Sequence, residues 1–209
     1  MSGKSKTKDR KNGSAEERIL AAALNEFADK GFFGARTQAI ADAAGLNKAM
    51  LHYYFRSKDN LYQTVLQNVL TLVFSQLKDI ILHGSSIENR LNLIVDLYMN
   101  IFSRNPKFIY LILRELVDGG ERLEKVLIGF NEMGLTPFKL LSSAAEDIEM
   151  NREEVLHLFI SIVSMSLFPL IIDPFLAVLQ NYDSRQIKAF RNERRAVIKA
   201  MLKAYLKEE

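Results

Sequence analysis

Helix N-cap signals recur along this chain of 209 residues, and apolar residues at helical spacing follow each of them. In Ser14-Ala15-Glu16-Glu17 the serine hydroxyl can accept the amide of the third helical residue, while Glu17 reaches back to the cap. The apolar stripe after it repeats every three to four residues, the period of a helix that buries one face. Related cap pairs are Ser85 with Glu88, Asn151 with Glu154, and Asp183 with Gln186. We therefore expect helices over about 15–30, 37–44, 47–55, 58–83, 91–102, 106–118, 121–134, 137–145, 152–179 (kinked at Pro169) and 184–205.

This pattern predicts an all-α fold. Glycine (10) and proline (4) are scarce for the length, and no alternating strand runs are closed by Asn-Gly or Asp-Gly turns. Two short helices joined by a turn at Ala44-Gly45-Leu46, with a third before them, form a helix-turn-helix pattern at about 36–55. We expect a basic disordered tail over 1–13, a three-helix DNA-binding domain over 14–60, and a C-terminal helical domain over 61–209.

Composition argues against an enzyme. Cysteine is absent, which excludes a thiolate nucleophile and thiolate metal ligands, and the three histidines His52, His83 and His157 are not at ligand spacing. Neither a Gly-x-Ser-x-Gly elbow nor a phosphate-binding loop is present. We expect no catalytic residues, no metal site and no cofactor.

Charge is concentrated at the N-terminal end. Residues 1–60 carry 11 Lys and Arg against 7 Asp and Glu, although the whole chain has a net charge of only +3. A basic end on a nearly neutral body is typical of a protein that binds a polyanion there. A solvated basic tail is the alternative, because Lys4, Lys6, Lys8, Arg10 and Lys11 supply much of the excess.

The stretch from Leu158 to Leu179 is apolar and long enough to cross a membrane. It contains Asp173, two prolines and three serines, and it lacks the basic flank that orients membrane spans. We therefore favour a buried or subunit-interface helix over a membrane span. No secretory signal opens the sequence, because residues 1–14 are polar and basic.

Residues 18–62 resemble the DNA-binding region of TetR-family bacterial transcriptional regulators (TetR/AcrR type). The resemblance rests on ILAAALNEFADKG at 19–31, on Thr37 with Ile40-Ala41 and Ala44-Gly45-Leu46, and on MLHYYFRSK at 50–58 with Leu61. Three positions depart from the family's common residues: Asn47 replaces serine, Met50 threonine and His52 tyrosine. These departures leave the operator sequence unreadable.

The resemblance implies roles for individual residues. Thr37, Tyr54 and Lys58 would bind phosphates, and a lysine at a helix N-terminus opposes the helix dipole unless an external anion balances it. The other candidate DNA contacts are Gln38, Asn47, Lys48, Ala49, Met50, His52 and Tyr53, while Ala22, Ile40, Leu51 and Phe55 are expected in the core.

The C-terminal body would, by the same resemblance, bind a small molecule and dimerise through its last two helices. Candidate pocket residues are Phe74, Leu77, Phe102, Phe130, Met133, Phe159 and Met165, although most of them are better explained as plain core. Candidate polar partners inside the body are Asn100, Arg114, Glu115, His157 and Asp173, with Arg114 and Glu115 also open to interpretation as a surface pair.

The function expected is a cytoplasmic, homodimeric repressor, not membrane-bound, that a hydrophobic or amphipathic effector releases from double-stranded operator DNA. Two alternatives remain. One is a DNA-binding regulator controlled by a protein partner, or one with no ligand pocket. The other, from a different class, is a helical enzyme, and it would require paired titratable groups in an apolar pocket.

Overall fold

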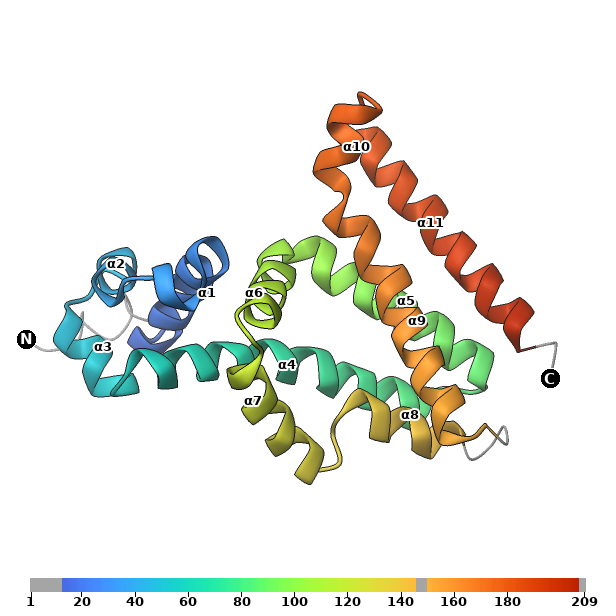
Figure 1. Ribbon diagram of the computed structural model, residues 1–209, viewed down its shortest axis with the longest axis horizontal. Coiled ribbons are helices and arrows are strands. Elements are labelled where there is room, and N and C mark those ends of the chain that lie inside the picture. The colour runs from blue at the N-terminus through green and yellow to red at the C-terminus, as the bar shows by residue number, and fades with distance from the viewer. Residues whose placement is uncertain (1–12, 146–149, 207–209) are drawn as a thin grey trace, which may run out of the picture. The chain divides into compact units, whose positions relative to one another are not determined.

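The computed structural model describes residues 13–145 and 150–206, and these residues form eleven α-helices with no strand among them (Figure 1). The all-α prediction is confirmed. In chain order the helices are α1 (Ala15–Gly34), α2 (Thr37–Ala43), α3 (Lys48–Phe55), α4 (Lys58–His83), α5 (Ile87–Arg104), α6 (Pro106–Val117), α7 (Glu121–Glu132), α8 (Pro137–Ala145), α9 (Arg152–Ile171), α10 (Asp173–Leu179) and α11 (Ser184–Tyr205).

Capping chemistry explains where most helices begin. The Ser14 hydroxyl accepts the Glu17 amide at 3.1 Å, and Glu17 accepts the Ser14 amide at 2.8 Å. Reciprocal pairs of the same kind begin α9 at Asn151 and α11 at Asp183. The cap of α5 was predicted one residue early: Ser86, not Ser85, accepts the Asn89 amide, at 3.2 Å.

The sequence predicted that the first helix ends before Gly31, but α1 extends to Gly34. Gly31 has a φ of +70°, which interrupts the helix, and the chain resumes helical geometry through Gly34. Glycine adopts positive φ without the steric penalty that a Cβ imposes. Near this interruption, the Arg114 guanidinium donates hydrogen bonds to the Ala28 and Asp29 carbonyls, at 2.7 and 2.8 Å.

The apolar stretch predicted as one helix to residue 179 is two helices. Helix α9 continues through Pro169 to Ile171, and α10 begins at Asp173 with Pro174 in its first turn. Proline has no amide to donate and clashes with the preceding turn, but it is tolerated where a new helix begins. The break therefore falls beside Pro174 and not at Pro169.

The chain divides into two compact units. The first contains the residues up to Val69 together with Tyr110–Val126, and the second contains Leu70–Ile109 with the residues from Leu127 onward. The predicted boundary at 60/61 differs from this division, because the first unit also takes nine further residues of α4 and the segment 110–126. The expected tail over 1–13 lies outside the described residues except for Gly13.

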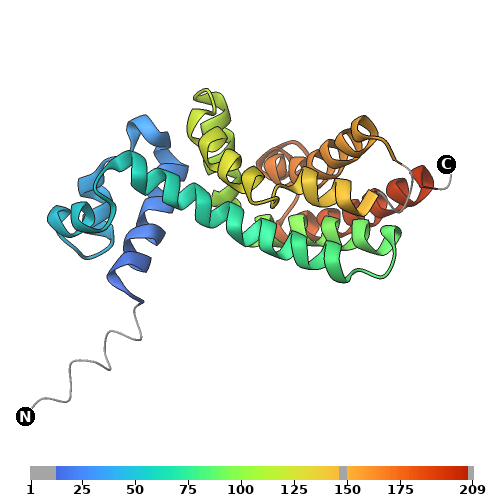
Figure 2. The same cartoon turned by 90° about the horizontal axis from the view of Figure 1, so that it is seen from below.

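Each unit has its own core. In the first, Ile19, Phe27, Ile40, Leu61 and Tyr62 are fully buried. In the second, α5 packs against α9 and α11 (Figures 1 and 2). The Asp96 carboxylate of α5 holds α11 through Arg195 at 3.3 Å and Lys199 at 2.7 Å.

Two described helices, α4 and α9, are long and apolar enough to cross a membrane by length and composition, with mean hydropathies of 1.3 and 1.9. Helix α4 contributes buried residues to both cores, including Leu66 and Leu77. Leu72 of the same helix is 41% exposed.

Candidate DNA interface

The turn between α2 and α3 sets the angle of the second helix. Gly45 has a φ of +66°, and the Leu46 amide donates to the Ala41 carbonyl at 2.9 Å, which closes the end of α2. Asn47 then caps α3 by accepting the Met50 amide at 2.9 Å. Ile40 of α2 with Leu51 and Phe55 of α3 are buried, as predicted, and they anchor both helices to the core. Ala22, predicted in the core, is only half-buried.

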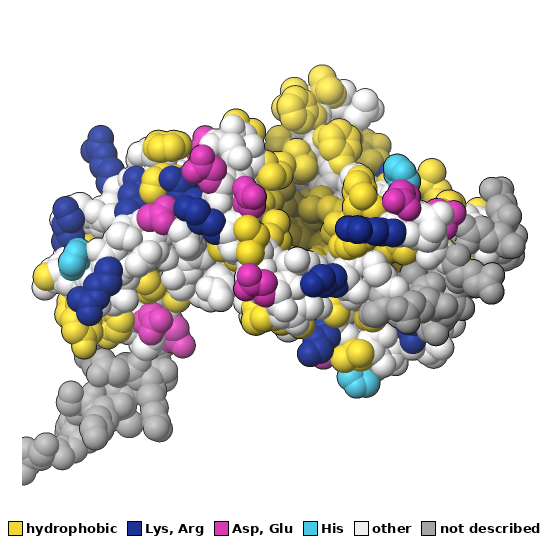
Figure 3. Space-filling view, turned by 60° about the horizontal axis from the view of Figure 1, so that its bottom comes forward, with side chains coloured by type: hydrophobic (Ala, Val, Ile, Leu, Met, Phe, Trp, Pro, Cys, Tyr) yellow, Lys and Arg dark blue, Asp and Glu magenta, His cyan; other side chains and the backbone are white. Residues whose placement is uncertain are grey.

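The opposite face of α3 is open. Lys48, Ala49, His52, Tyr53 and Tyr54 are all exposed, and Tyr53 is 67% exposed. The Tyr53 and Tyr54 rings meet edge to face with centroids 5.4 Å apart. In the space-filling view, Lys and Arg side chains gather over the end of the chain that α1, α2 and α3 form (Figure 3).

Two predicted contacts already have partners within the protein. The Gln38 amide nitrogen donates to Asp42 Oδ1 at 2.8 Å, and the Asn47 side-chain oxygen caps α3. A base contact by Gln38 therefore requires it to leave Asp42, whereas the Asn47 amide nitrogen can donate elsewhere while its oxygen holds the cap. Thr37 and Met50 are half-buried at the starts of their helices.

Lys58 lies at the first position of α4. Its Nζ donates to the Phe33 carbonyl at 3.4 Å and lies 4.8 Å from the centroid of the Phe32 ring. Partial burial lowers the pKa of Lys58, and the nearby positive charge of Arg122 lowers it further. An anion beside Lys58 would counteract both effects, because it stabilises the charged amine.

Arg122 connects the segment 110–126 to these helices. Its guanidinium lies 3.6 Å from the Phe32 ring centroid, and its Nε donates to Asp59 Oδ1 at 3.0 Å. Phe32 thus has Lys58 and Arg122 near one ring. No sequence signal pointed to Arg122, since it lies 63 residues from Asp59 in the chain.

Glu115 stabilises the turn that presents Arg122. Its side chain is fully buried, and Oε1 accepts the Arg122 and Leu123 amides at 2.8 and 3.4 Å. Its Oε2 lies 3.9 Å from Arg122 Nη1. Burial, reinforced by the Glu115 carboxylate, raises the pKa of Tyr62 well above its ordinary value. Arg114 and Glu115 are therefore not a surface pair: each has backbone partners of its own.

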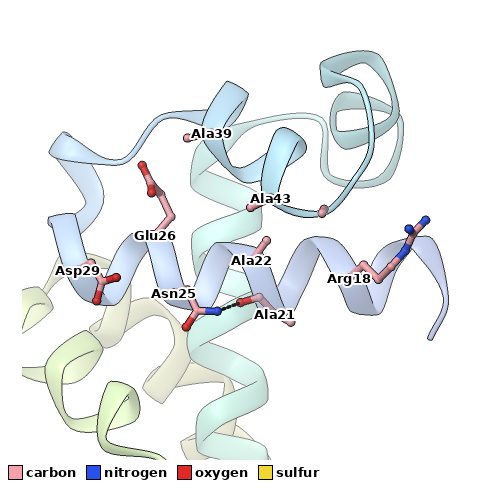
Figure 4. A pocket seen from close by; sticks show the side chains of 9 residues that line it. Arg18, Ala21, Ala22, Asn25, Glu26, Asp29, Ala39 and Ala43 are labelled. Atoms are coloured by element: carbon pink, nitrogen blue, oxygen red, sulfur yellow. Dashed lines mark hydrogen bonds between the residues drawn. The ribbon is translucent and has the colours of Figure 1, made fainter. Parts of the chain in front are cut away.

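A groove of about 370 Å³ lies between α1 and α2 (Figure 4). Alanine methyl groups form its floor, with Arg18 towards the start of α1 and Glu26 and Asp29 towards its end. Burial opposes ionisation of Glu26, but hydrogen bonds from Lys30 and the Arg36 amide outweigh it and lower the pKa of that carboxyl. The groove is open and carries no cluster of metal-ligating residues, and no such cluster occurs among the described residues.

The predicted ligand residues differ in their surroundings. Phe74 and Phe130 meet edge to face at 5.0 Å, and both are buried with Leu77 and Phe102 in the second unit. Met133 is 59% exposed, so its assignment to an interior pocket is wrong. Of the seven, Met165 lines a cavity of about 200 Å³ between α9 and α11, whose other walls are His157, Leu158, Ser161, Met201, Leu202 and Tyr205.

Helices α9 and α11 expose apolar residues in rows. Leu156, Ile160 and Phe168 share one row of α9 at multiples of four residues, and Val197, Met201 and Tyr205 form another on α11; all six are 40–60% exposed. Of the remaining predicted polar groups, Asp173 pairs with Arg191 and Asn100 accepts Arg195 at 2.8 Å. His157 lines the cavity.

Comparison with known proteins bears first on the helix-turn-helix. Residues 19–65 match the family described as bacterial regulatory proteins, tetR family. The transcriptional regulator RutR of Escherichia coli K12 is 47% identical over 60 residues, 29% of this chain and 28% of RutR. The transcriptional repressor NicS of Pseudomonas putida is 28% identical over 109 residues, 52% of this chain and 51% of NicS. These matches thus cover from about a quarter to a half of the relatives' length.

A solved structure extends the likeness to the whole fold. The regulator FadR of Bacillus subtilis in complex with stearoyl-CoA has a TM-score of 0.62 and 15% identity, and the match covers 87% of this chain and 96% of FadR. At this identity the likeness concerns the fold. It establishes the same succession of an N-terminal helix-turn-helix and a C-terminal helical domain.

Proposed function

We propose that the chain is a TetR-family regulator, a cytoplasmic, dimeric repressor that an amphipathic ligand releases from operator DNA. The open face of α3, held over a buried core by Ile40, Leu51 and Phe55, is the observation that carries this proposal. A helix fixed on one side and exposed on the other is what entry into the major groove requires.

The side chains on this face suit a duplex. Lys48 at the start of α3 can donate to guanine O6 and N7, and the Met50 methyl can pack on a thymine methyl. His52 and Tyr53 follow on the exposed face and would contact bases or the backbone, and Ala49 permits close approach. Thr37, Tyr54 and Lys58 would bind phosphates, which position the helix, while Gln38 and Asn47 supply amide donors.

Dimerisation would use α9 and α11. Their exposed apolar rows lie on adjacent helices of the second unit, and ion pairs at Asp96 and Asp173 tie α11 to that unit. Burying such rows against a second copy removes apolar area from water, the dominant favourable term in association. A dimer also presents two α3 helices, because one recognition helix alone covers too few base pairs for adequate sequence specificity.

The ligand would act through α4. This helix begins at the helix-turn-helix and ends in the second unit, where Phe74, Leu77 and Ile81 are buried. A molecule bound beside the C-terminal half of α4 would favour one position of this helix over another. It can shift the DNA-binding equilibrium only by the difference between its affinities for the two positions of the helix. The stearoyl-CoA held by B. subtilis FadR is an amphipathic molecule of the kind expected, and it is therefore the first probe.

Selection of bound duplexes from a random library tests the DNA-binding proposal. We expect one shared inverted repeat, bound at least about a thousandfold more tightly than a scrambled duplex of equal length. A selected pool with no common motif would refute it. Stearoyl-CoA is then titrated into the complex: a decrease of about 5- to 150-fold in DNA affinity supports this ligand class. Specific DNA binding that stays constant with acyl-CoA favours control by a protein partner.

A further inference from the structure

The junction between α3 and α4 carries a strained residue that the proposed function does not use. Arg56 follows the last residue of α3 with φ and ψ of +63° and −46°. The Ser57 amide donates to the Phe55 carbonyl at 2.6 Å, so Arg56 is the central residue of a γ-turn, and γ-turns with positive φ are rare and strained. Among the described residues other than glycine, Asn181 alone shares a positive φ, and asparagine tolerates it better. Glycine would adopt this backbone without the steric penalty, so the turn itself does not require an arginine.

The Arg56 side chain is exposed and has no polar partner that would explain its place in this turn. Its guanidinium makes no hydrogen bond or ion pair with any part of the chain that the structure describes. Asp59, the nearest acid along the chain, is already engaged, because one carboxylate oxygen accepts Arg122 Nε and the other accepts the Gln63 side-chain amide. The charge of Arg56 is therefore free to meet an external anion.

Other cations of the first unit have partners inside it. Lys30 pairs with Glu26 at 2.8 Å, and the Arg114 guanidinium donates to two carbonyls of α1. Arg56 is similar to Lys48 instead: both side chains are exposed, and neither forms a hydrogen bond or ion pair with a described residue. An uncommitted positive charge therefore lies at each end of α3.

The length of α3 brings its C-terminal end to the height of the phosphates. The helix has 8 residues, and at about 1.5 Å per residue it is about 12 Å long. The major groove is only about 8.5 Å deep, so a helix that enters it by its N-terminal residues has its last turn at the rim, where the phosphates lie. Tyr54 and Lys58, both proposed phosphate contacts, are each two residues from Arg56 in the chain.

We propose that Arg56 is a further DNA-binding residue, which binds a backbone phosphate at the rim of the groove that α3 enters. This inference rests on the proposed function, because it takes α3 as the element that places the protein on DNA. A guanidinium can hold one phosphate through two parallel N–H donors, a more restrictive geometry than that of a lysine amine. The contact reads no base: it adds affinity and salt dependence, and it fixes the orientation of α3 on the duplex.

Three variants of the full-length protein separate the charge of Arg56 from its backbone strain. Arg56→Gln removes the charge and keeps a Cβ, Arg56→Lys keeps the charge, and Arg56→Gly removes both the charge and the strain. Fluorescence anisotropy on the selected duplex measures DNA affinity as a function of salt. At about 0.1 M salt, Arg56→Gln and Arg56→Gly should bind roughly tenfold or more weakly, and their salt slopes should fall by about 0.9 for each phosphate no longer neutralised, or about 1.8 per dimer. Arg56→Lys should keep the wild-type slope.

Folding stability should change in the direction opposite to DNA affinity. Arg56→Gly should raise the midpoint of urea unfolding, because glycine relieves the strain of the γ-turn, whereas Arg56→Gln should leave the midpoint near the wild-type value. Arg56→Gly is therefore expected to be the more stable protein and the weaker DNA binder. A residue that serves only the fold would not lower the salt slope when it is replaced.

Two variants in the second unit serve as controls. Asn181→Gly is the matched backbone control, because Asn181 has a φ of +53°, and it should leave DNA affinity unchanged. Arg104→Gln removes an exposed cation and should keep the wild-type salt slope. A wild-type slope in Arg56→Gln, or an equal decrease of the slope in Arg104→Gln, would overturn the proposal and leave the function of α3 intact. Failure of the wild type to select any duplex would instead refute the proposed function, and the role of Arg56 with it.

Discussion

Lys58 is the DNA-facing candidate whose electrostatics are best defined. Its amine is held by the Phe33 carbonyl and shares the Phe32 ring with Arg122. Burial and the Arg122 charge lower its pKa, so the free protein is less able to keep this amine charged than an isolated lysine is. A DNA phosphate favours the charged form, and binding should therefore take up a proton at alkaline pH.

Replacing Lys58 with arginine isolates this effect. Arginine stays protonated, so Lys58→Arg should lose less DNA affinity than wild type as the pH rises towards the ordinary pKa of lysine. The lowered pKa affects the folding stability of the free protein in the opposite direction to its DNA affinity. Over this pH range the unfolded chain binds more protons at Lys58 than the folded protein does, so the contribution of Lys58 to the free energy of unfolding rises with pH. Parallel affinity curves for the two proteins would remove the phosphate role from Lys58.

Asn47 has two roles that substitutions can separate. Asn47→Ala should lower the free energy of unfolding by about 1 kcal/mol, because the Met50 amide loses its cap, whereas Asn47→Asp keeps an accepting oxygen. For DNA affinity the order of the two variants should be reversed: Asn47→Asp should bind more weakly than Asn47→Ala, because an aspartate repels phosphates and an alanine does not. Urea unfolding and anisotropy on the selected duplex measure the two quantities. The same order in both would show that Asn47 acts only as a cap.

Among the elements, helix starts were the most predictable from sequence. Ser14, Asn151 and Asp183 cap the expected helices because the whole cap lies within four residues of the chain. The wrong predictions concern positions where the local sequence offers two equally suitable residues. Ser85 and Ser86 could each cap α5, and Pro169 and Pro174 could each interrupt the apolar run.

Contacts between distant segments could not be predicted. Arg122 and Asp59 are 63 residues apart, and Arg114 and Ala28 are 86 apart, so no local pattern links them. The outward residues of α3 were predictable for the opposite reason: the period of its buried residues Leu51 and Phe55 determines which side chains face solvent. Met133 was misplaced because an apolar residue near a helix end need not face inward.

Glu115 should stabilise the α6–α7 turn. Glu115→Ala leaves the Arg122 amide without its buried acceptor, and we expect a decrease of about 2–4 kcal/mol in the free energy of unfolding. Glu115→Gln retains an oxygen for that amide and should be less destabilising. Urea denaturation at one fixed protein concentration provides the comparison. Equal decreases would mean that the charge of Glu115, and not its acceptor geometry, stabilises the turn.

At the scale of the whole molecule, the apolar rows of α9 and α11 predict the oligomeric state. Ile160→Asp/Phe168→Asp places two charges in the proposed interface and should give monomers at micromolar concentration, because buried charges without partners are costly. Sedimentation velocity measures this. Ile128→Asp, at a similarly exposed position of α7, is the matched control and should remain dimeric. A wild type that sediments as a monomer would contradict the dimer directly.

The most direct measurement of sequence reading by α3 is a single-base-pair substitution scan of the selected duplex. Wild type should lose about 1–3 kcal/mol of binding free energy at each contacted position. Lys48→Ala should lose discrimination at one or two positions and keep the rest of the profile, while Lys58→Ala should weaken all duplexes about equally. A Lys48→Ala profile identical in shape to that of wild type would contradict the claim that the start of α3 reads the bases.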